Sequence, residues 1–190
     1  MKDPDLTRNP WTTKTTETVY ESAWIRVDRS DVLNPAGNPA VYSVVHFKNL
    51  AIGVLVIDKD YNIWLVGQFR YPVNEYSWEI PEGGGSFAVE PVESARRELK
   101  EEAGIVAGRY EEFQRLHLSN SATDELSITF LATELSFEES EPEESEVLQI
   151  KKLHLSEAFE WCMQGKITDA ISVAAILKAK WLYDRGELKV

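Results

Sequence analysis

The sequence predicts an α/β (α+β) fold, and three observations support this prediction. Strand-like runs rich in Val, Ile and Leu occupy much of the chain before Arg70. A helix-length segment follows a run of three glycines and stops at Gly104. Two further segments with helical apolar spacing lie near the C-terminus. A length of 190 residues suggests that these elements form one domain.

Composition narrows the classes of function. A hydrophobic content of 43% with 11% aromatic residues fits a globular protein. The net charge of −12 argues against nucleic acid as the main partner, because such binding depends on Lys and Arg neutralising phosphates. The single cysteine, Cys162, excludes an internal disulfide and is compatible with a reducing cytoplasm. We read no signal peptide in the first residues and no apolar run long enough to span a membrane. We therefore expect a cytoplasmic protein with no membrane partner.

The N-terminal part is expected to be a polar tail followed by strands. Residues 1–17 contain Pro4 and Pro10 and predict an irregular tail. Residues 18–48 read as strands broken at Asn34–Asn38, where Asn-Pro and Gly-Asn pairs favour a turn. This pattern predicts a hairpin within the domain that spans residues 18–190.

The rest of the chain is read from its apolar periodicity and its turn residues. Two buried strands are expected on either side of Lys59–Tyr61. Further along, the sequence predicts a strand, loop and strand over residues 113–136, an exposed acidic loop over 137–146, and another strand. Two C-terminal helices are separated by Gly165–Lys166. Their expected N-caps are Ser156 for the first helix, and Thr168 or Asp169 for the second.

The segment before Gly104 carries a cluster of acidic residues. Glu98, Glu101 and Glu102 recur at spacings of three and four, so a helix places them on one face. Like charges at this spacing destabilise an isolated helix, and a divalent cation with oxygen ligands would compensate them. The alternative is an ordinary solvated acidic face. Three apolar residues fall off this face and could seat the helix on a core: Ala95, Leu99 and Ala103.

The glycine run precedes this helix. Pro81 and Gly83–Gly85 predict a loop of bare backbone that a ligand can approach closely. Where such a loop leads into a helix N-terminus, an anion could bind.

The stretch from Glu79 to Ile105 resembles the signature of the Nudix hydrolases, G-x5-E-x7-R-E-U-x-E-E-x-G-U, where U is a bulky aliphatic residue. Counted from Gly83, seven positions match in register: Arg97, Glu98, Leu99, Glu101, Glu102, Gly104 and Ile105. One position departs, because Val89 stands where the signature has its first glutamate. The resemblance then implies weakened rather than absent metal binding, with Glu90 able to substitute after a small loop shift.

A second run points to one branch of that family. Gln68–Pro72 resembles the Q-[FY]-R-x-P run of ADP-ribose and nucleoside diphosphate sugar pyrophosphatases. The resemblance implies a mixed β-sheet sandwiched between α-helices, with an N-terminal extension that helps to form a homodimer. ADP-ribose hydrolases commonly carry a proline beyond the box where this chain has Ser121. That difference bears on ADP-ribose specificity and not on the broader class.

The resemblance also assigns site residues. Glu98, Glu101 and Glu102, with the backbone carbonyl of Glu82, would bind Mg²⁺, with Mn²⁺ as the alternative. The implied catalytic residues are Glu102, Arg97, which would orient the carboxylates, and Glu144, favoured as general base over Glu143 and Glu146. The implied substrate contacts are Arg70, Gly83, Gly84, Glu79, Trp24 and His46. For Trp24 and His46, a place in the core of the hairpin is an equally open reading.

The implied reaction is hydrolysis of the diphosphate bond of a nucleoside diphosphate sugar. ADP-ribose, giving AMP and ribose 5-phosphate, is the first expectation, and GDP-mannose or UDP-glucose comes next. The competing hypothesis is a Nudix domain that senses a nucleotide without turnover, for which Val89 is the supporting feature.

Overall fold

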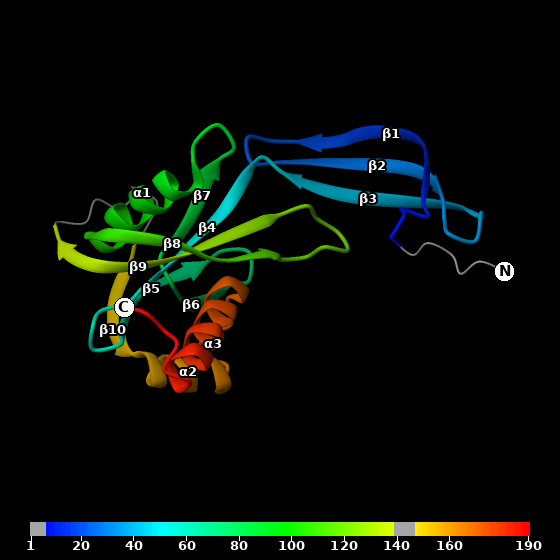
Figure 1. Cartoon of the computed structure of the whole chain (residues 1–190). Helices are drawn as coiled ribbons and strands as arrows, with labels where there is room; N and C mark the ends of the chain where they lie inside the picture. The colour runs from blue at the N-terminus through cyan, green and yellow to red at the C-terminus, as the bar shows by residue number, and fades with distance from the viewer. Residues whose placement is uncertain (1–6, 139–146) are drawn as a thin grey trace. The chain divides into compact units, whose positions relative to one another are not determined.

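The computed structural model describes residues 7–138 and 147–190 (Figure 1). Over these residues the chain forms seven strands, one helix, three more strands and then two helices. The strands are β1 (Thr12–Glu21), β2 (Ile25–Leu33), β3 (Pro39–Phe47), β4 (Asn49–Val56), β5 (Asn62–Arg70), β6 (Glu75–Glu79), β7 (Glu82–Ser86), β8 (Ile105–His117), β9 (Leu126–Phe137) and β10 (Gln149–His154). The helices are α1 (Pro91–Ala103), α2 (Leu155–Met163) and α3 (Ala170–Asp184).

These elements belong to two compact units. The first comprises the chain up to Lys48 together with Ser119–Glu125. The second comprises Asn49–Leu118 and Leu126–Val190. The segment that resembles the Nudix signature lies wholly in the second unit.

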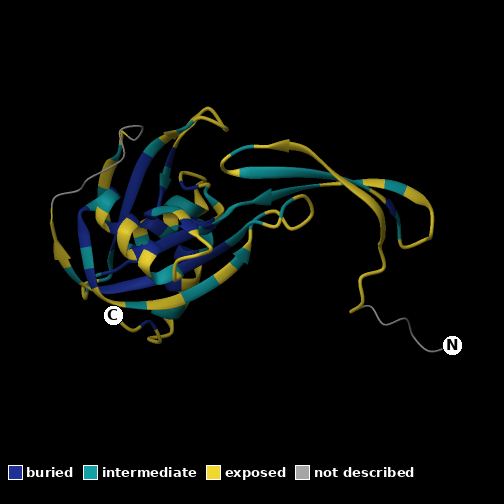
Figure 2. Cartoon of the chain, turned by 90° about the horizontal axis from the view of Figure 1, so that it is seen from above, coloured by how far each residue is buried: buried dark blue, intermediate teal, exposed yellow. Residues whose placement is uncertain are grey.

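The first unit is built on an antiparallel sheet in the order β1-β2-β3. The predicted hairpin is confirmed as β2 and β3, whose turn is closed by Asn34: its Oδ1 accepts hydrogen bonds from the amides of Ala36 and Asn38, each at 3.0 Å. β1 begins at Thr12, so the expectation of an irregular tail up to residue 17 is wrong for its last residues. Every residue of β1 is exposed (Figure 2). Its sequence therefore has no alternation of buried and exposed positions from which the whole strand could have been predicted.

The second unit contains a mixed sheet and a smaller antiparallel sheet. The mixed sheet has the order β7-β4-β9-β8, in which β4 and β9 run parallel. The other sheet has the order β10-β5-β6. Figure 1 shows α1 on one side of the strands β4 and β9, and α2 with α3 on the other. The predicted mixed sheet between helices is therefore confirmed.

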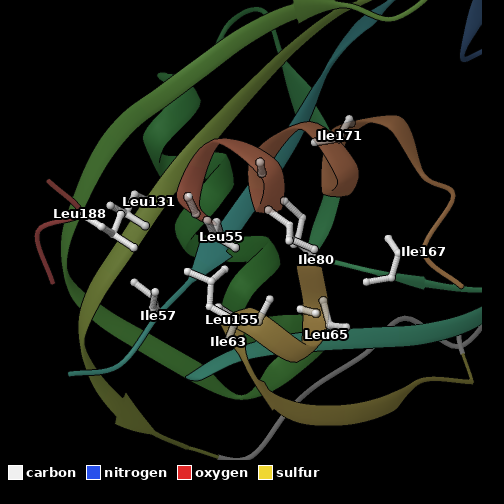
Figure 3. Close-up of a cluster of buried hydrophobic side chains, with 14 residues drawn as sticks. Leu55, Ile57, Ile63, Leu65, Ile80, Leu131, Leu155, Ile167, Ile171 and Leu188 are labelled. Atoms are coloured by element: carbon white, nitrogen blue, oxygen red, sulfur yellow. The ribbon is translucent and has the colours of Figure 1, made fainter. Parts of the chain in front are cut away.

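Strand β4 shows why the layers form, because its side chains alternate between two cores. Ile52 and Val54 pack in one cluster with Leu99 of α1. Leu55 points the other way, into the cluster beneath α2 and α3 (Figure 3). All four of these side chains are fully buried, and each burial contributes roughly 1.5–3 kcal/mol.

The glycine run differs from its prediction. Glu82–Ser86 is the edge strand β7, which pairs antiparallel with β4 from Asn49↔Ser86 to Gly53↔Glu82. Glycine carries no side-chain pattern, so this pairing left no trace in the apolar periodicity. The helix begins later, at Pro91, and its N-cap is Glu90. The glycines therefore do not lead directly into the helix N-terminus, and the expected anion loop is wrong.

Of the three predicted helix boundaries, the end of α1 and the N-cap of α3 are confirmed and the N-cap of α2 is wrong. α1 stops at Gly104, which adopts the left-handed conformation with φ 63°. Asp169 caps α3 as expected, since its carboxylate accepts a hydrogen bond from the amide of Ser172 at 2.7 Å. The predicted cap of α2 is wrong: His154 is the N-cap, and its Nδ1 accepts from the amide of Ser156 at 3.1 Å.

Across residues 7–138 and 147–190, none of the helices combines the length and apolar character needed to cross a bilayer.

Candidate functional site

The acidic face of α1 is buried rather than solvated. Only 8% of Glu98 and 3% of Glu102 is exposed, whereas the Glu101 side chain is about one-third exposed, at 34%. On the adjoining side of the helix, Ala95 and Leu99 lie in the core, and both are fully buried. Burying a carboxylate is costly unless charge or hydrogen bonds compensate it. These exposures therefore favour a built site over an ordinary solvated face.

Arg97 supplies part of that compensation. Its Nη1 donates to Glu101 Oε2 at 2.8 Å, and its Nη2 donates to Glu98 Oε1 and to the carbonyl of Gly84, the latter at 2.9 Å. Partial burial opposes the charged form, but Glu98 and Glu101 outweigh it and raise the pKa of Arg97. One guanidinium thus joins two of the carboxylates to strand β7.

Strand β7 lies directly against the acidic face. The amide of Glu82 donates a hydrogen bond to Glu102 Oε2 at 2.9 Å. One residue further on, a Cβ added to Gly83 would overlap the carboxyl group of Glu98. A side chain at position 83 would therefore displace the Glu98 carboxylate. The structure brings Glu82, Gly83, Gly84 and the α1 carboxylates together.

Arg70, at the end of β5, lies in an acidic environment of its own. Its Nε donates to both carboxylate oxygens of Glu79 at 3.0 Å, and its Nη2 donates to Glu82 Oε1 at 2.9 Å. Burial opposes ionisation, yet these two glutamates raise the pKa of Arg70 and keep it a cation. The Glu79 side chain is 4% exposed, which makes this a charge pair within the protein rather than a surface contact.

A pocket of about 280 Å³ opens beside this pair. Its lining joins the ends of β5, β6 and β7 to the start of α3: Arg70, Pro72, Val73, Ser77, Glu79, Glu82, Thr168 and Asp169. Burial, followed by the charges of Asp169 and Glu79, raises the pKa of the Glu82 carboxyl well above its ordinary value. The pocket therefore offers one fixed cation among several carboxyl groups.

The donor set of the α1 face fits a hard divalent cation by its chemistry. Carboxylates and a backbone carbonyl are the oxygen ligands that Mg²⁺ and Mn²⁺ accept. In the part of the chain that the structure describes, no three His, Cys, Asp or Glu side chains converge tightly enough to enclose an ion. Arg97 instead engages Glu98 and Glu101. A cation bound here would therefore share the carboxylates of Glu98 and Glu101 with this guanidinium, since each carboxylate has two oxygens.

The departure from the Nudix signature also has a place in the structure. Val89 lies in the turn before α1, is 46% exposed, and lines a pocket of about 390 Å³ together with Glu93 and Arg97. A glutamate at position 89 would share this pocket with Arg97. Glu90 is the exposed N-cap of α1, and its side chain makes no capping hydrogen bond.

Trp24 and His46 lie in the first unit, so their role as substrate contacts stays a prediction. Trp24 is 69% exposed. His46 is instead bracketed by two carboxylates, with Nδ1 2.7 Å from Asp124 Oδ2 and Nε2 3.4 Å from Asp28 Oδ2. The first pair fastens the segment Ser119–Glu125 to β3. The three candidates for the general base all lie outside the described residues: Glu143, Glu144 and Glu146.

Two residues near the site were not among the predicted site residues. Asp169 and Ser172 lie at the start of α3, where the sequence predicted only a helix N-cap at Thr168 or Asp169. Asp169 lines the pocket beside Glu82, and the Ser172 hydroxyl accepts a hydrogen bond from the amide of Ile80. The predicted N-cap at Asp169 marked the start of the helix, but sequence spacing could not show that this helix packs beside Ile80 and Glu82.

Comparisons with known proteins agree with this geometry. The family model described as NUDIX domain matches residues 47–172, well over half of the chain. An ADP-ribose pyrophosphatase of Bacillus subtilis is 30% identical, covering 84% of this chain and 87% of that protein. One from Mycobacterium tuberculosis is 29% identical, with 90% and 84% covered. A methanol dehydrogenase activator of Bacillus methanolicus is 28% identical, with 85% and 88% covered.

The fold is also shared with a solved structure. A crystal structure described as an ADP compounds hydrolase superposes with a TM-score of 0.83. The match covers 94% of this chain and 97% of that chain at 23% identity. Identity at this level supports the fold alone.

Proposed function

The chain belongs to the Nudix family, and from that premise we propose that it hydrolyses the diphosphate of ADP-ribose to AMP and ribose 5-phosphate. In this reaction the oxygen of water bonds to one phosphorus, and the bond from that phosphorus to the bridging oxygen breaks. The observation that carries the proposal is the buried pair Glu98 and Glu102, tied to strand β7 through Arg97 and the amide of Glu82. Such a face suits a reaction in which cations meet a polyanionic substrate.

The proposed cation ligands are Glu98, Glu101 and Glu102, with the carbonyl of Glu82. Bound Mg²⁺, or Mn²⁺ in its place, would supply positive charge to the diphosphate and make the attacking water more acidic. Arg97 would fix the carboxylates of Glu98 and Glu101 against β7. The absence of a side chain at Gly83 lets that strand lie against Glu98.

We assign Arg70 to the substrate's phosphate or base. The Arg70 side chain is 36% exposed and lines the pocket, while Glu79 and Glu82 hold the orientation of its guanidinium. A planar guanidinium fixed in this way can donate to phosphate oxygens or stack on a ring. Glu79 would act on the substrate through Arg70.

The substrate class is supported by the two relatives named ADP-ribose pyrophosphatases, which match along most of their length. The methanol dehydrogenase activator, whose name gives a different role, matches almost as well, so overall similarity does not by itself select the substrate. GDP-mannose and UDP-glucose are therefore the comparison substrates. A homodimer and a cytoplasmic location belong to the same proposal, and the free thiol of Cys162 suits a reducing compartment.

The test is product identification. Purified protein is incubated with ADP-ribose, GDP-mannose or UDP-glucose, with Mg²⁺, with Mn²⁺ and with a chelator, and products are identified by mass spectrometry. The proposal expects AMP and ribose 5-phosphate, formed fastest from ADP-ribose and only with a divalent cation. Binding of ADP-ribose without turnover on any substrate would refute hydrolysis and favour the sensing role that Val89 suggests.

A further inference from the structure

A hydroxyl far away in the sequence holds the backbone just before the acidic site. Ser172 Oγ, in the first turn of α3, accepts a hydrogen bond from the amide of Ile80 at 2.8 Å. Both residues are fully buried, and 92 positions separate them in the chain. Ile80 links the end of β6 to Pro81 and to Glu82, the first residue of β7. The bond therefore acts on the turn that delivers β7 to the acidic face.

The start of α3 is itself fixed in place. The carboxylate of Asp169 accepts from the amide of Ser172 at 2.7 Å and so caps the helix. Ile171 packs against β4 at Gly53, where an added Cβ would lie only 2.8 Å from Ile171 Cγ2 and 3.2 Å from Ile80 Cδ1. Figure 3 shows Ile80 and Ile171 in the same buried cluster. Because there is no free space at this junction, the Ser172 hydroxyl has little freedom to move.

The turn is held from other sides as well. The carbonyl of Pro81 accepts from the amide of Val54 at 2.8 Å. The amide of Glu82 donates to Glu102 Oε2 at 2.9 Å. Three consecutive residues thus each have one backbone group fixed by a different element: Ile80 by α3, Pro81 by β4, and Glu82 by α1.

We propose that Ser172 is a positioning residue for the carboxylate face. It makes no contact with the reacting groups in this assignment, and acts through the Ile80–Glu82 backbone on the carbonyl of Glu82 and on the carboxylate of Glu102. The inference rests on the proposed function in one respect: it takes a divalent cation to be the ligand whose affinity depends on the positions of the Glu82 carbonyl and the Glu102 carboxylate. Residues that orient metal ligands typically change metal affinity about 10- to 100-fold when they are removed.

The experiment compares two buried serines. Ser172→Ala removes the acceptor of the Ile80 amide and leaves that donor buried without a partner. Ser127→Ala is the matched control, since Ser127 on β9 is equally buried and its hydroxyl has no hydrogen-bond partner among the residues that the structure describes. Mn²⁺ binding to each full-length protein is measured by electron paramagnetic resonance without substrate, and urea unfolding shows that each variant is folded.

The expected result is an Mn²⁺ dissociation constant about 10- to 100-fold higher for Ser172→Ala, with Ser127→Ala equal to wild type. Equal Mn²⁺ affinity in Ser172→Ala and wild type would overturn the inference while leaving the proposed function intact. Wild-type protein that binds no Mn²⁺ and hydrolyses no diphosphate would overturn both.

A second pair of variants isolates the hydroxyl at constant side-chain shape, and urea unfolding again shows whether each variant is folded. Ser172→Thr and Ser172→Val have nearly the same shape and differ in the hydroxyl. The inference expects the threonine variant to bind Mn²⁺ about 10- to 100-fold more tightly than the valine variant. Equal affinities for this pair would contradict it.

Discussion

Gly83→Ala is the substitution whose effect follows most directly from the packing of β7 on α1. The three atoms nearest to an added Cβ all belong to the carboxyl group of Glu98, and they would overlap it. Gly83 has an ordinary strand conformation, so alanine is not excluded by the backbone. The effect should therefore come from the collision with Glu98 alone. Gly84→Ala is the matched comparison, because its Cβ would meet Asn49 Nδ2 at an ordinary 3.7 Å.

The magnitude can be worked from this contrast. Replacing glycine by alanine limits the unfolded chain and stabilises by about 0.4–1 kcal/mol wherever the fold accepts it. That term applies to both variants and cancels between them. Overpacking a buried contact costs about 1–3 kcal/mol. We expect Gly83→Ala to be less stable than Gly84→Ala by about 1–3 kcal/mol, unless Glu98 swings away, in which case Mn²⁺ binding is lost instead.

The assay is urea unfolding followed by tryptophan fluorescence, together with Mn²⁺ binding of each folded variant. A lower unfolding free energy or a loss of Mn²⁺ affinity in Gly83→Ala, relative to Gly84→Ala, agrees with the geometry. Two variants that are alike in both measurements would show that β7 does not lie against Glu98 in solution.

Three further predictions test separate features. Glu102→Gln keeps the shape of the side chain but removes its charge, so kcat/KM for ADP-ribose should fall by at least about 100-fold, whereas the exposed Glu93→Gln on the same helix should leave it unchanged. Burial opposes ionisation of Asp58, but hydrogen bonds from Lys152 and nearby amides lower its pKa to about 2. Asp58→Asn should therefore cost about 1 kcal/mol in urea unfolding at pH 7, and the gap should close as the pH falls from about 4 towards 2; a constant gap would contradict this. Burial raises the pKa of the Cys162 thiol to about 11, so labelling by a disulfide reagent at pH 8 should be roughly two orders of magnitude slower than for an ordinary thiol, and equal rates before and after denaturation would refute this.

Apolar patterns predicted the elements whose side chains pack in the cores. The alternation in β4 places Ile52 and Val54 in one core and Leu55 in the other, and the spacing in α1 places Leu99 in the core beside the carboxylate face. Both patterns are visible in the sequence, because each position repeats the burial of its neighbours two or three to four residues away. The end of α1 at Gly104 was equally readable.

Elements without such a pattern were missed. β1 is exposed along its whole length, so its first residues looked like a polar tail. β7 is set by backbone pairing with β4, and its three glycines carry no side chains that could reveal a face. His154 caps α2 from the last position of a strand, where a helix start was not expected.

The candidate site also has features that the sequence predicts and features that it does not. The spacing of Glu98, Glu101 and Glu102 on one helix predicted a shared face, because such neighbours are one turn apart. Their burial could not be predicted, since it depends on where β7 packs. The hydrogen bond between Ile80 and Ser172 joins residues that only the folded chain brings together, and no local pattern marks it.

The central claim is that the acidic face of α1 binds divalent cations beside strand β7. Anomalous diffraction from crystals soaked in Mn²⁺ tests it most directly. The account predicts anomalous density within bonding distance of the carboxylates of Glu98 and Glu102 and of the carbonyl of Glu82. Crystals in which both carboxylates point into solvent, with no anomalous density near β7, would contradict it.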